Sequence, residues 1–259
     1  MKHMRGRAAV VAGMLAALPV TAVQAEGSFT LSSGLDFSSG KYGSTQRTDT
    51  VYVPVIGKYE TGDWTFKLTV PWVSIRGPGG VVGSGSDRVT IGSVSGNRRG
   101  TESGLGDVVA GASYTVFESG GWVLDLGGKV KLPTGSESRG LGTGKADFTV
   151  QADVYRSIGP ASLFGTLGYK RMGDPDGTDF RNPVFASVGL AHRVGASTTV
   201  GLSYDWRQRL RPTSDEISEI TLFASHRFSD QWKAQLYAVT GFSDASPDWG
   251  SGLIIGRMF

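Results

Sequence analysis

Two histidines, His192 and His226, lie beyond the first 25 residues of the chain and are the first candidates for acid–base chemistry. A catalytic histidine needs a nucleophile within hydrogen-bond reach, in a site that is open to substrate. Both histidines instead lie near the ends of segments of alternating polarity, on the apolar face of those segments. We therefore expect them to lie at an apolar interface, and we predict no catalytic residue and no enzyme.

Metal and nucleotide chemistry are equally poorly supported. The chain has no cysteine, which excludes a thiolate-based metal site, and two histidines without a third ligand make a poor one. The run Asp174-Pro175-Asp176-Gly177 resembles a calcium loop in composition but lacks its spacing and terminal glutamate. Gly104-Leu105-Gly106-Asp107 is not a Walker motif, and no βαβ pattern follows it. We predict turns in both places, no metal site and no cofactor.

Charged residues form a more informative pattern, because nearly all of them share one face of the alternating segments. The polar face carries 14 charges, whereas the apolar face carries only Arg171 and Arg257, each near a segment end. The candidates that we expect to line an interior are Lys58, Lys67, Lys129, Lys131, Asp147, Arg193, Asp205, Arg227 and Lys233. Such mixed charge is either a network of ion pairs that fills the interior or a lining that selects a solute.

Twelve segments of about ten residues must position these charges. They span 29–37, 51–59, 64–72, 106–116, 122–132, 146–154, 163–171, 184–194, 198–206, 220–228, 232–240 and 249–259. In 198–206, for example, Val200, Leu202 and Tyr204 share one face and alternate with small or polar residues, which is the period of a β-strand. A strand that crosses a membrane needs about 9–11 residues, and bacterial barrels use an even number of strands.

A soluble β-sandwich alternates in the same way, so other features must decide between it and a membrane barrel. Aromatic residues such as Trp64, Trp122, Trp206 and Trp249 fall at segment ends, as in the aromatic girdles of a membrane barrel. The connections run 13, 4, 33, 5, 13, 8, 12, 3, 13, 3 and 8 residues, so long and short ones alternate. We predict an all-β fold: a closed antiparallel transmembrane β-barrel of 12 strands with long extracellular loops and short periplasmic turns.

The longest predicted connection, residues 73–105, has a glycine-rich middle. Eight of the residues from Gly77 to Gly100 are glycine, and Arg88, Arg98 and Arg99 are interspersed among them. We expect a mobile outer loop, with a constriction folded into the barrel as the alternative.

The first 25 residues resemble an export signal that is removed before folding. Lys2, Arg5 and Arg7 precede an apolar stretch over residues 8–20, and Val23-Gln24-Ala25 is a small-residue cleavage site. We expect a signal peptide over 1–25 and a barrel over 26–259. Without the signal, 23 basic residues balance 23 acidic ones, which argues against a nucleic-acid partner.

The C-terminal residue Phe259 ends an apolar-patterned stretch that begins at Gly252. This stretch resembles the C-terminal signal that the barrel-assembly machinery reads, although Arg257 departs from the pattern. The resemblance implies that Phe259 contacts this machinery, and outer-membrane lipid is the second expected partner.

Short motifs in a fixed order carry a wider resemblance. They are Ser38-Ser39-Gly40-Lys41-Tyr42-Gly43, Val53-Pro54-Val55, Val70-Pro71-Trp72, Ser103-Gly104-Leu105-Gly106-Asp107, Lys131-Leu132-Pro133-Thr134-Gly135 and Gly168-Tyr169. Together they are similar to the "MetA-pathway of phenol degradation" family of outer-membrane proteins. The resemblance implies a barrel associated with the uptake of organic compounds, and it assigns no catalytic or ligand residue.

The resulting functional hypothesis is an outer-membrane channel for passive uptake of small solutes, with aromatic and other organic compounds as candidates. A closed barrel with a structural or surface-interaction role is the alternative, and an outer-membrane enzyme is the third hypothesis. The inner half of the polar lining is net positive, so a conducting barrel should favour anions modestly.

Overall fold

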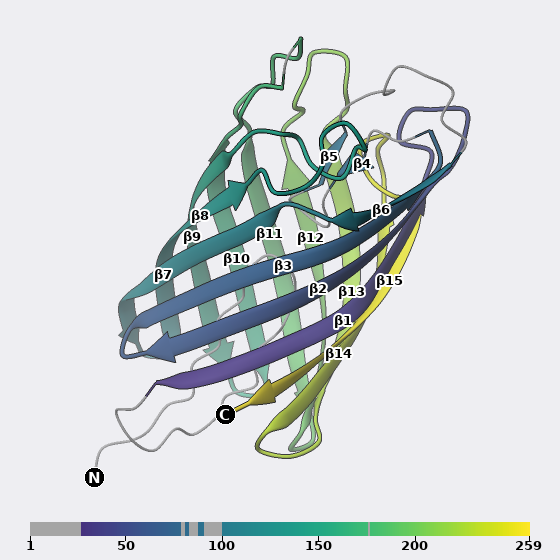
Figure 1. Cartoon of the computed structure of the whole chain (residues 1–259). Helices are drawn as coiled ribbons and strands as arrows, with labels where there is room; N and C mark the ends of the chain where they lie inside the picture. The colour runs from purple at the N-terminus through teal and green to yellow at the C-terminus, as the bar shows by residue number, and fades with distance from the viewer. Residues whose placement is uncertain (1–26, 79–80, 83–87, 91–99, 176) are drawn as a thin grey trace.

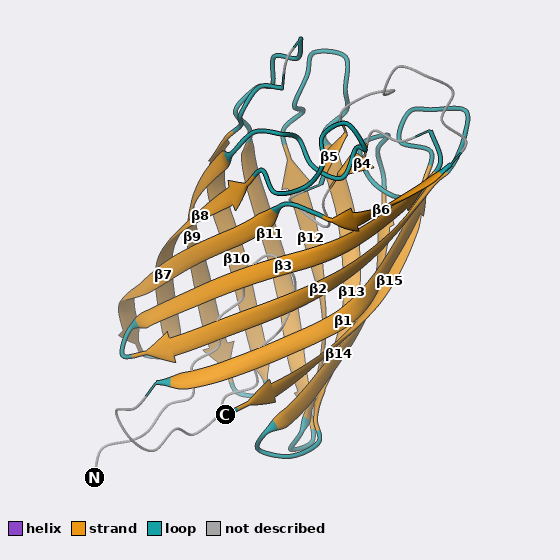
Figure 2. Ribbon diagram, viewed as in Figure 1, coloured by secondary structure: helices purple, strands orange, loops and turns teal. Residues whose placement is uncertain are grey.

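The computed structural model describes residues 27–78, 81–82, 88–90, 100–175 and 177–259. Over these residues the chain is a closed antiparallel β-barrel of 12 strands, as predicted (Figures 1 and 2). The predicted signal peptide, with its cleavage site before Glu26, lies outside the described residues. No helix in the described ranges is long and apolar enough to cross a membrane.

The strands follow one another around the barrel wall. Their bounds are β1 Ser28–Gly40, β2 Thr48–Thr61, β3 Trp64–Arg76, β6 Thr101–Leu105, β7 Val108–Ser119, β8 Trp122–Leu132, β9 Asp147–Ile158, β10 Ala161–Arg171, β11 Val184–Val194, β12 Thr198–Arg207, β13 Ile217–Arg227, β14 Trp232–Gly241 and β15 Trp249–Met258. β6 and β7 both pair with β3 and are two parts of the fourth strand. β1 pairs with β15 and closes the barrel.

The two ends of the barrel differ in their connections. Long loops gather at one end, whereas short turns join the strands at the other, where β1 also begins and β15 ends (Figure 1). Gly62 and Gly195 lie in two of the short turns with φ values of 54° and 71°, a conformation that glycine adopts without steric cost. The turn after β9 is shorter than predicted, because β9 continues to Ile158 and β10 begins at Ala161.

The outer face of the barrel is apolar. Val150, Leu167, Leu222 and Leu236 are about 60% exposed on the faces of their strands that point away from the lumen. Such a continuous apolar belt would aggregate in water and is stable in lipid. His192 and His226 lie on this face at the short-turn end, where we expected them.

Aromatic side chains meet at both rims of the belt. The rings of Trp64 and Tyr114 lie 5.0 Å apart near the short turns, and those of Phe37 and Trp249 lie 5.1 Å apart near the long loops. These positions suit the two membrane–water interfaces, where amphipathic rings sit at the headgroup level.

Candidate functional site

Part of the longest connection lies inside the barrel. Its short strands β4 (Val81–Val82) and β5 (Val89–Thr90) pair with each other, and Val81 and Val89 are each only 2% exposed. Val89 packs in a cluster with Met172, Phe180 and Leu210, which come from two other long loops. For the described residues, the expectation of an outer loop is therefore wrong, because they are packed and buried, and the alternative of a constriction in the barrel stays a prediction.

A buried ion pair fixes this segment to the wall at β12 and β13. Arg88 Nη1 donates to Glu219 Oε1 at 2.5 Å, and Arg207 Nη1 donates to the Arg88 carbonyl oxygen at 2.5 Å. All three residues are less than 5% exposed. We call Arg88, Glu219 and Arg207 the latch. In the neighbouring loop, burial raises the pKa of the Tyr42 hydroxyl, and the Arg88 charge partly offsets that rise.

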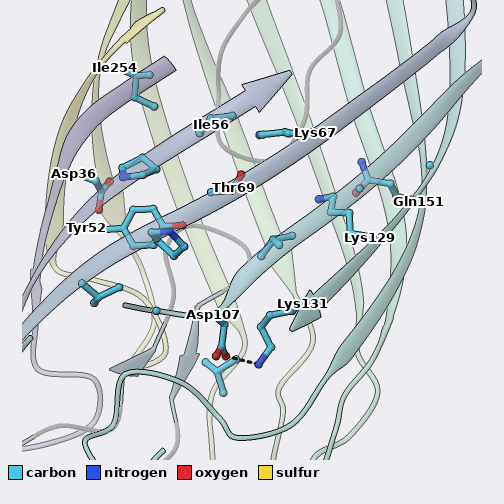
Figure 3. Close-up of a pocket in the computed structure, with 18 of the residues that line it drawn as sticks. Asp36, Tyr52, Ile56, Lys67, Thr69, Asp107, Lys129, Lys131, Gln151 and Ile254 are labelled. Carbon is cyan, nitrogen blue, oxygen red and sulfur yellow. Dashed lines mark hydrogen bonds and ion pairs between the residues drawn. The ribbon is translucent and has the colours of Figure 1, made fainter. Parts of the chain in front are cut away.

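The lumen holds a cavity along the opposite part of the wall. Its volume is about 150 Å³, many times the roughly 10–15 Å³ that one water requires. Its lining includes Asp36, Tyr52, Pro54, Ile56, Lys67, Thr69, Pro71, Val73, Asp107, Val109, Gly111, Lys129, Lys131, Leu141, Tyr237 and Ile254 (Figure 3). The cavity therefore combines an apolar wall with several charged groups.

Two prolines form the middle of that apolar wall. Pro54 on β2 and Pro71 on β3 are directly opposite each other in the strand register. Proline lacks a backbone N–H, and it is rare inside sheets except at edges and bulges. The ladder between β1 and β2 is indeed interrupted beside Pro54, and β6 and β7 are separated beside Pro71, where Gly106 N donates to the Pro71 carbonyl at 2.9 Å.

Three predicted lumen residues lie in one row of paired backbone positions that crosses four neighbouring strands. Lys58 on β2 is opposite Lys67 on β3, Lys67 is opposite Gly111 on β7, and Gly111 is opposite Lys129 on β8. The row starts near the short turns and ends near the long loops, because Lys67 lies near the beginning of β3 and Lys129 near the end of β8. Because the strands are tilted, this row of register partners rises along the barrel axis, and its charged residues lie at different heights in the lumen.

Lys131 lies at the loop end of the cavity and is part of a compact network. Its Nζ is 2.7 Å from Asp107 Oδ2 and 3.4 Å from Asp147 Oδ2. Asp107 also accepts a hydrogen bond from the Gly135 N–H at 3.0 Å, and Asp147 accepts one from the Gly173 N–H at 3.0 Å. These contacts tie two long loops to the barrel wall, which gives this cluster a structural role.

The other predicted lumen residues point inward but are spread around the barrel. Arg227 on β13 is directly opposite Lys233 on β14, near the short turns. Arg193 lies near the same end on β11. Asp205 on β12 is opposite Glu219 of the latch and accepts a hydrogen bond from Ser203 at 2.9 Å.

Some important residues were missed by the sequence analysis. Tyr237 on β14 donates a hydrogen bond to Asp36 on β1 across the intervening strand β15, although 201 positions separate the two residues in the chain. Arg88 and Glu219 are 131 positions apart. No local pattern marks these contacts; Pro54 and Pro71, which fall within the predicted strands 51–59 and 64–72, are the signal for the cavity wall, because proline is unfavourable in a central strand.

Solved structures of bacterial outer-membrane barrels are similar to this chain. An outer membrane channel from Pseudomonas putida F1 is 14% identical, with a TM-score of 0.67 over 92% of this chain and 97% of that chain. The KdgM porin is 8% identical, with a TM-score of 0.53 over 89% of this chain and 99% of that chain. At these identities the likeness shows the shared barrel fold. With the apolar belt, it confirms the predicted location in a bacterial outer membrane.

A family model provides the link at the level of sequence. No curated protein sequence matches the chain. The family described as "Putative MetA-pathway of phenol degradation" matches residues 21–253, which is nearly the whole barrel and includes every motif on which the resemblance was based, and the chain belongs to this family.

Proposed function

We propose that this protein is a passive channel for small organic solutes in the outer membrane. The observation that carries the proposal is the lumen cavity, which has room for water and combines apolar walls with charged groups. A barrel that served only as a membrane anchor would gain stability by filling this space. The likeness to an outer membrane channel and a porin supports the same function.

Catalysis forms no part of this proposal. The described residues contain no group of three or more His, Cys, Asp or Glu that could hold a metal ion. His226 contacts Thr198 Oγ1 through Nδ1 at 2.8 Å and lies edge-on to the Phe228 ring, on the lipid face. These contacts suit a side chain that anchors the barrel at the membrane interface.

Conductance of the purified barrel in planar bilayers tests the proposal. We expect discrete conductance steps in KCl and uptake of small aromatic solutes by proteoliposomes. A folded protein, verified by its heat-modifiable mobility in gels, that gives neither conductance nor uptake would contradict the proposed channel. The second candidate, a closed structural barrel, would then be preferred, because the latch and the inserted β4–β5 segment already narrow the lumen.

Export and assembly complete the proposed function. We infer that residues 1–25 are a cleaved signal and that the assembly machinery recognises the C-terminal strand through Phe259. The Phe259 N–H donates to the Phe29 carbonyl at 2.8 Å, and the Arg257 guanidinium lies 4.7 Å from the Phe259 ring centroid. The arginine at this rim is therefore covered by an aromatic ring, which reduces the cost of its lipid-facing position.

A further inference from the structure

We propose that the lumen cavity binds small organic anions, with the anionic group at Lys67 and an apolar ring against Ile56, where the apolar wall that continues to Pro54 and Pro71 begins. This inference names the solute class of the proposed channel and so depends on that function for transport. The binding site itself can be tested separately.

The cationic part of the site contains like charges that face each other. Lys58 and Lys67 are directly opposite on the inner face of β2 and β3, an arrangement that destabilises a sheet. Lys233 lies close enough to Lys58 and Glu60 to interact with both electrostatically. Glu60 bonds Lys58 at 2.8 Å, so the group contains three lysines and one glutamate. The group carries a net positive charge, which attracts an anion.

The apolar part of the site begins at the next inward positions of the same two strands. Going from the lysines toward the loops, the inner face presents Ile56, then Pro54 beside Pro71, then Tyr52 beside Val73. Each step is about 7 Å along the strand, because inward positions are two residues apart. A ring attached to a carboxylate at Lys67 therefore reaches Ile56, one step away, and the two prolines extend the apolar wall by one further step, about 14 Å from the lysine along the strand.

The prolines add evidence that this wall serves a ligand. Each lacks a donor for the ladder, and the pairing of β2 with β1 and of β3 with β6 and β7 is interrupted beside them, whereas β2 and β3 remain paired with each other. At Pro71 the Gly106 N–H donates to the proline carbonyl instead. The result is a rigid apolar surface, on which an aromatic ring loses little on leaving water.

The carboxylates that line the cavity already have donors. Asp36 accepts a hydrogen bond from the Tyr237 hydroxyl, and Asp107 is paired with Lys131. Asp153 accepts hydrogen bonds from Gln151 at 2.7 Å and from Thr166 at 2.6 Å. The donors stabilise these carboxylates within the wall, and the Lys131 charge offsets that of Asp107, which reduces the repulsion of an anionic solute.

Calorimetric titration of the detergent-solubilised barrel tests the site with three probes: benzoate, its neutral analogue benzamide, and acetate, which lacks the ring. We expect benzoate to bind at least about tenfold more tightly than either of the others, since each lacks one of the two contacts. Equal binding of benzoate and benzamide by the folded protein would overturn the proposal, and this arm requires no variant.

Variants locate the site. Lys67→Gln should weaken benzoate binding about tenfold, and Ile56→Thr about fourfold. The matched control Lys41→Gln removes the same charge from an exposed loop residue and should change nothing. Unchanged affinity in a folded Lys67→Gln barrel would place the anion elsewhere and reject this site.

Conductance separates this inference from the proposed function. If the barrel conducts KCl but neither binds benzoate nor admits it in preference to benzamide, the proposed channel is supported and the proposed binding site is rejected. If the barrel binds benzoate at Lys67 but conducts no ion, the binding site is supported and the passive channel is rejected.

Discussion

The inner walls at β12–β13 and at β2–β3 have the same alternation of inward and outward residues, yet they differ in the signs of the charges that meet there. At β12–β13, Arg88 and Glu219 have opposite signs, are buried and contact each other. At β2–β3, Lys58 and Lys67 have the same sign and face each other, and Lys67 lines the cavity. A buried pair of opposite charges holds the wall together, whereas like charges that face each other leave a net positive charge that attracts an anion.

The largest expected effect is at the latch. Glu219→Gln leaves the buried Arg88 guanidinium without its counter-charge, which should destabilise the folded barrel by about 3–5 kcal/mol. Urea unfolding in lipid vesicles, followed by tryptophan fluorescence, measures the change. Asp230→Asn in an exposed short turn is the control and should change little. A Glu219→Gln barrel as stable as the parent would mean that the latch adds nothing to stability.

A smaller loss of stability should distinguish the lipid-facing side of β3 from its lumen-facing side. Leu68 points into lipid and is 48% exposed, whereas its neighbour Thr69 lines the cavity. Leu68→Arg should cost about 2–4 kcal/mol, because it places a charge in the apolar belt, and Thr69→Arg should cost much less. The fraction of heat-modifiable, folded protein after assembly is the measurement. Equal losses in both variants would refute the register, since a slip of one residue exchanges the faces.

The sequence predicts the fold well because alternation and turn chemistry are local. Local sequence does not predict which charges come together, because these contacts depend on strand tilt and on closure of the barrel. Sequence position alone puts Lys67 near one end and Lys129 near the other, and only the register shows that Gly111 connects them in one row. The insertion of Arg88 into the lumen depends equally on contacts between distant segments, so no local pattern distinguished it from an outer loop.

The smallest change in stability, which is a gain and not a loss, is expected from a substitution near the short turns. Lys233 faces Arg227 directly across β13 and β14 and lies within electrostatic range of Lys58. Lys233→Gln removes a repulsion, so the barrel should become more stable by about 0.2–1 kcal/mol, or remain unchanged. Urea unfolding measured beside Glu219→Gln gives the comparison within one experiment.

The same variant should also affect conduction. With a positive charge removed from the periplasmic half of the lumen, the reversal potential in a KCl gradient should shift toward cation selectivity. If Lys233→Gln instead destabilises the barrel by as much as Glu219→Gln, the lysine belongs to a structural network like the latch. The contrast between the two walls would then fail, because charge on both would serve to hold the barrel together.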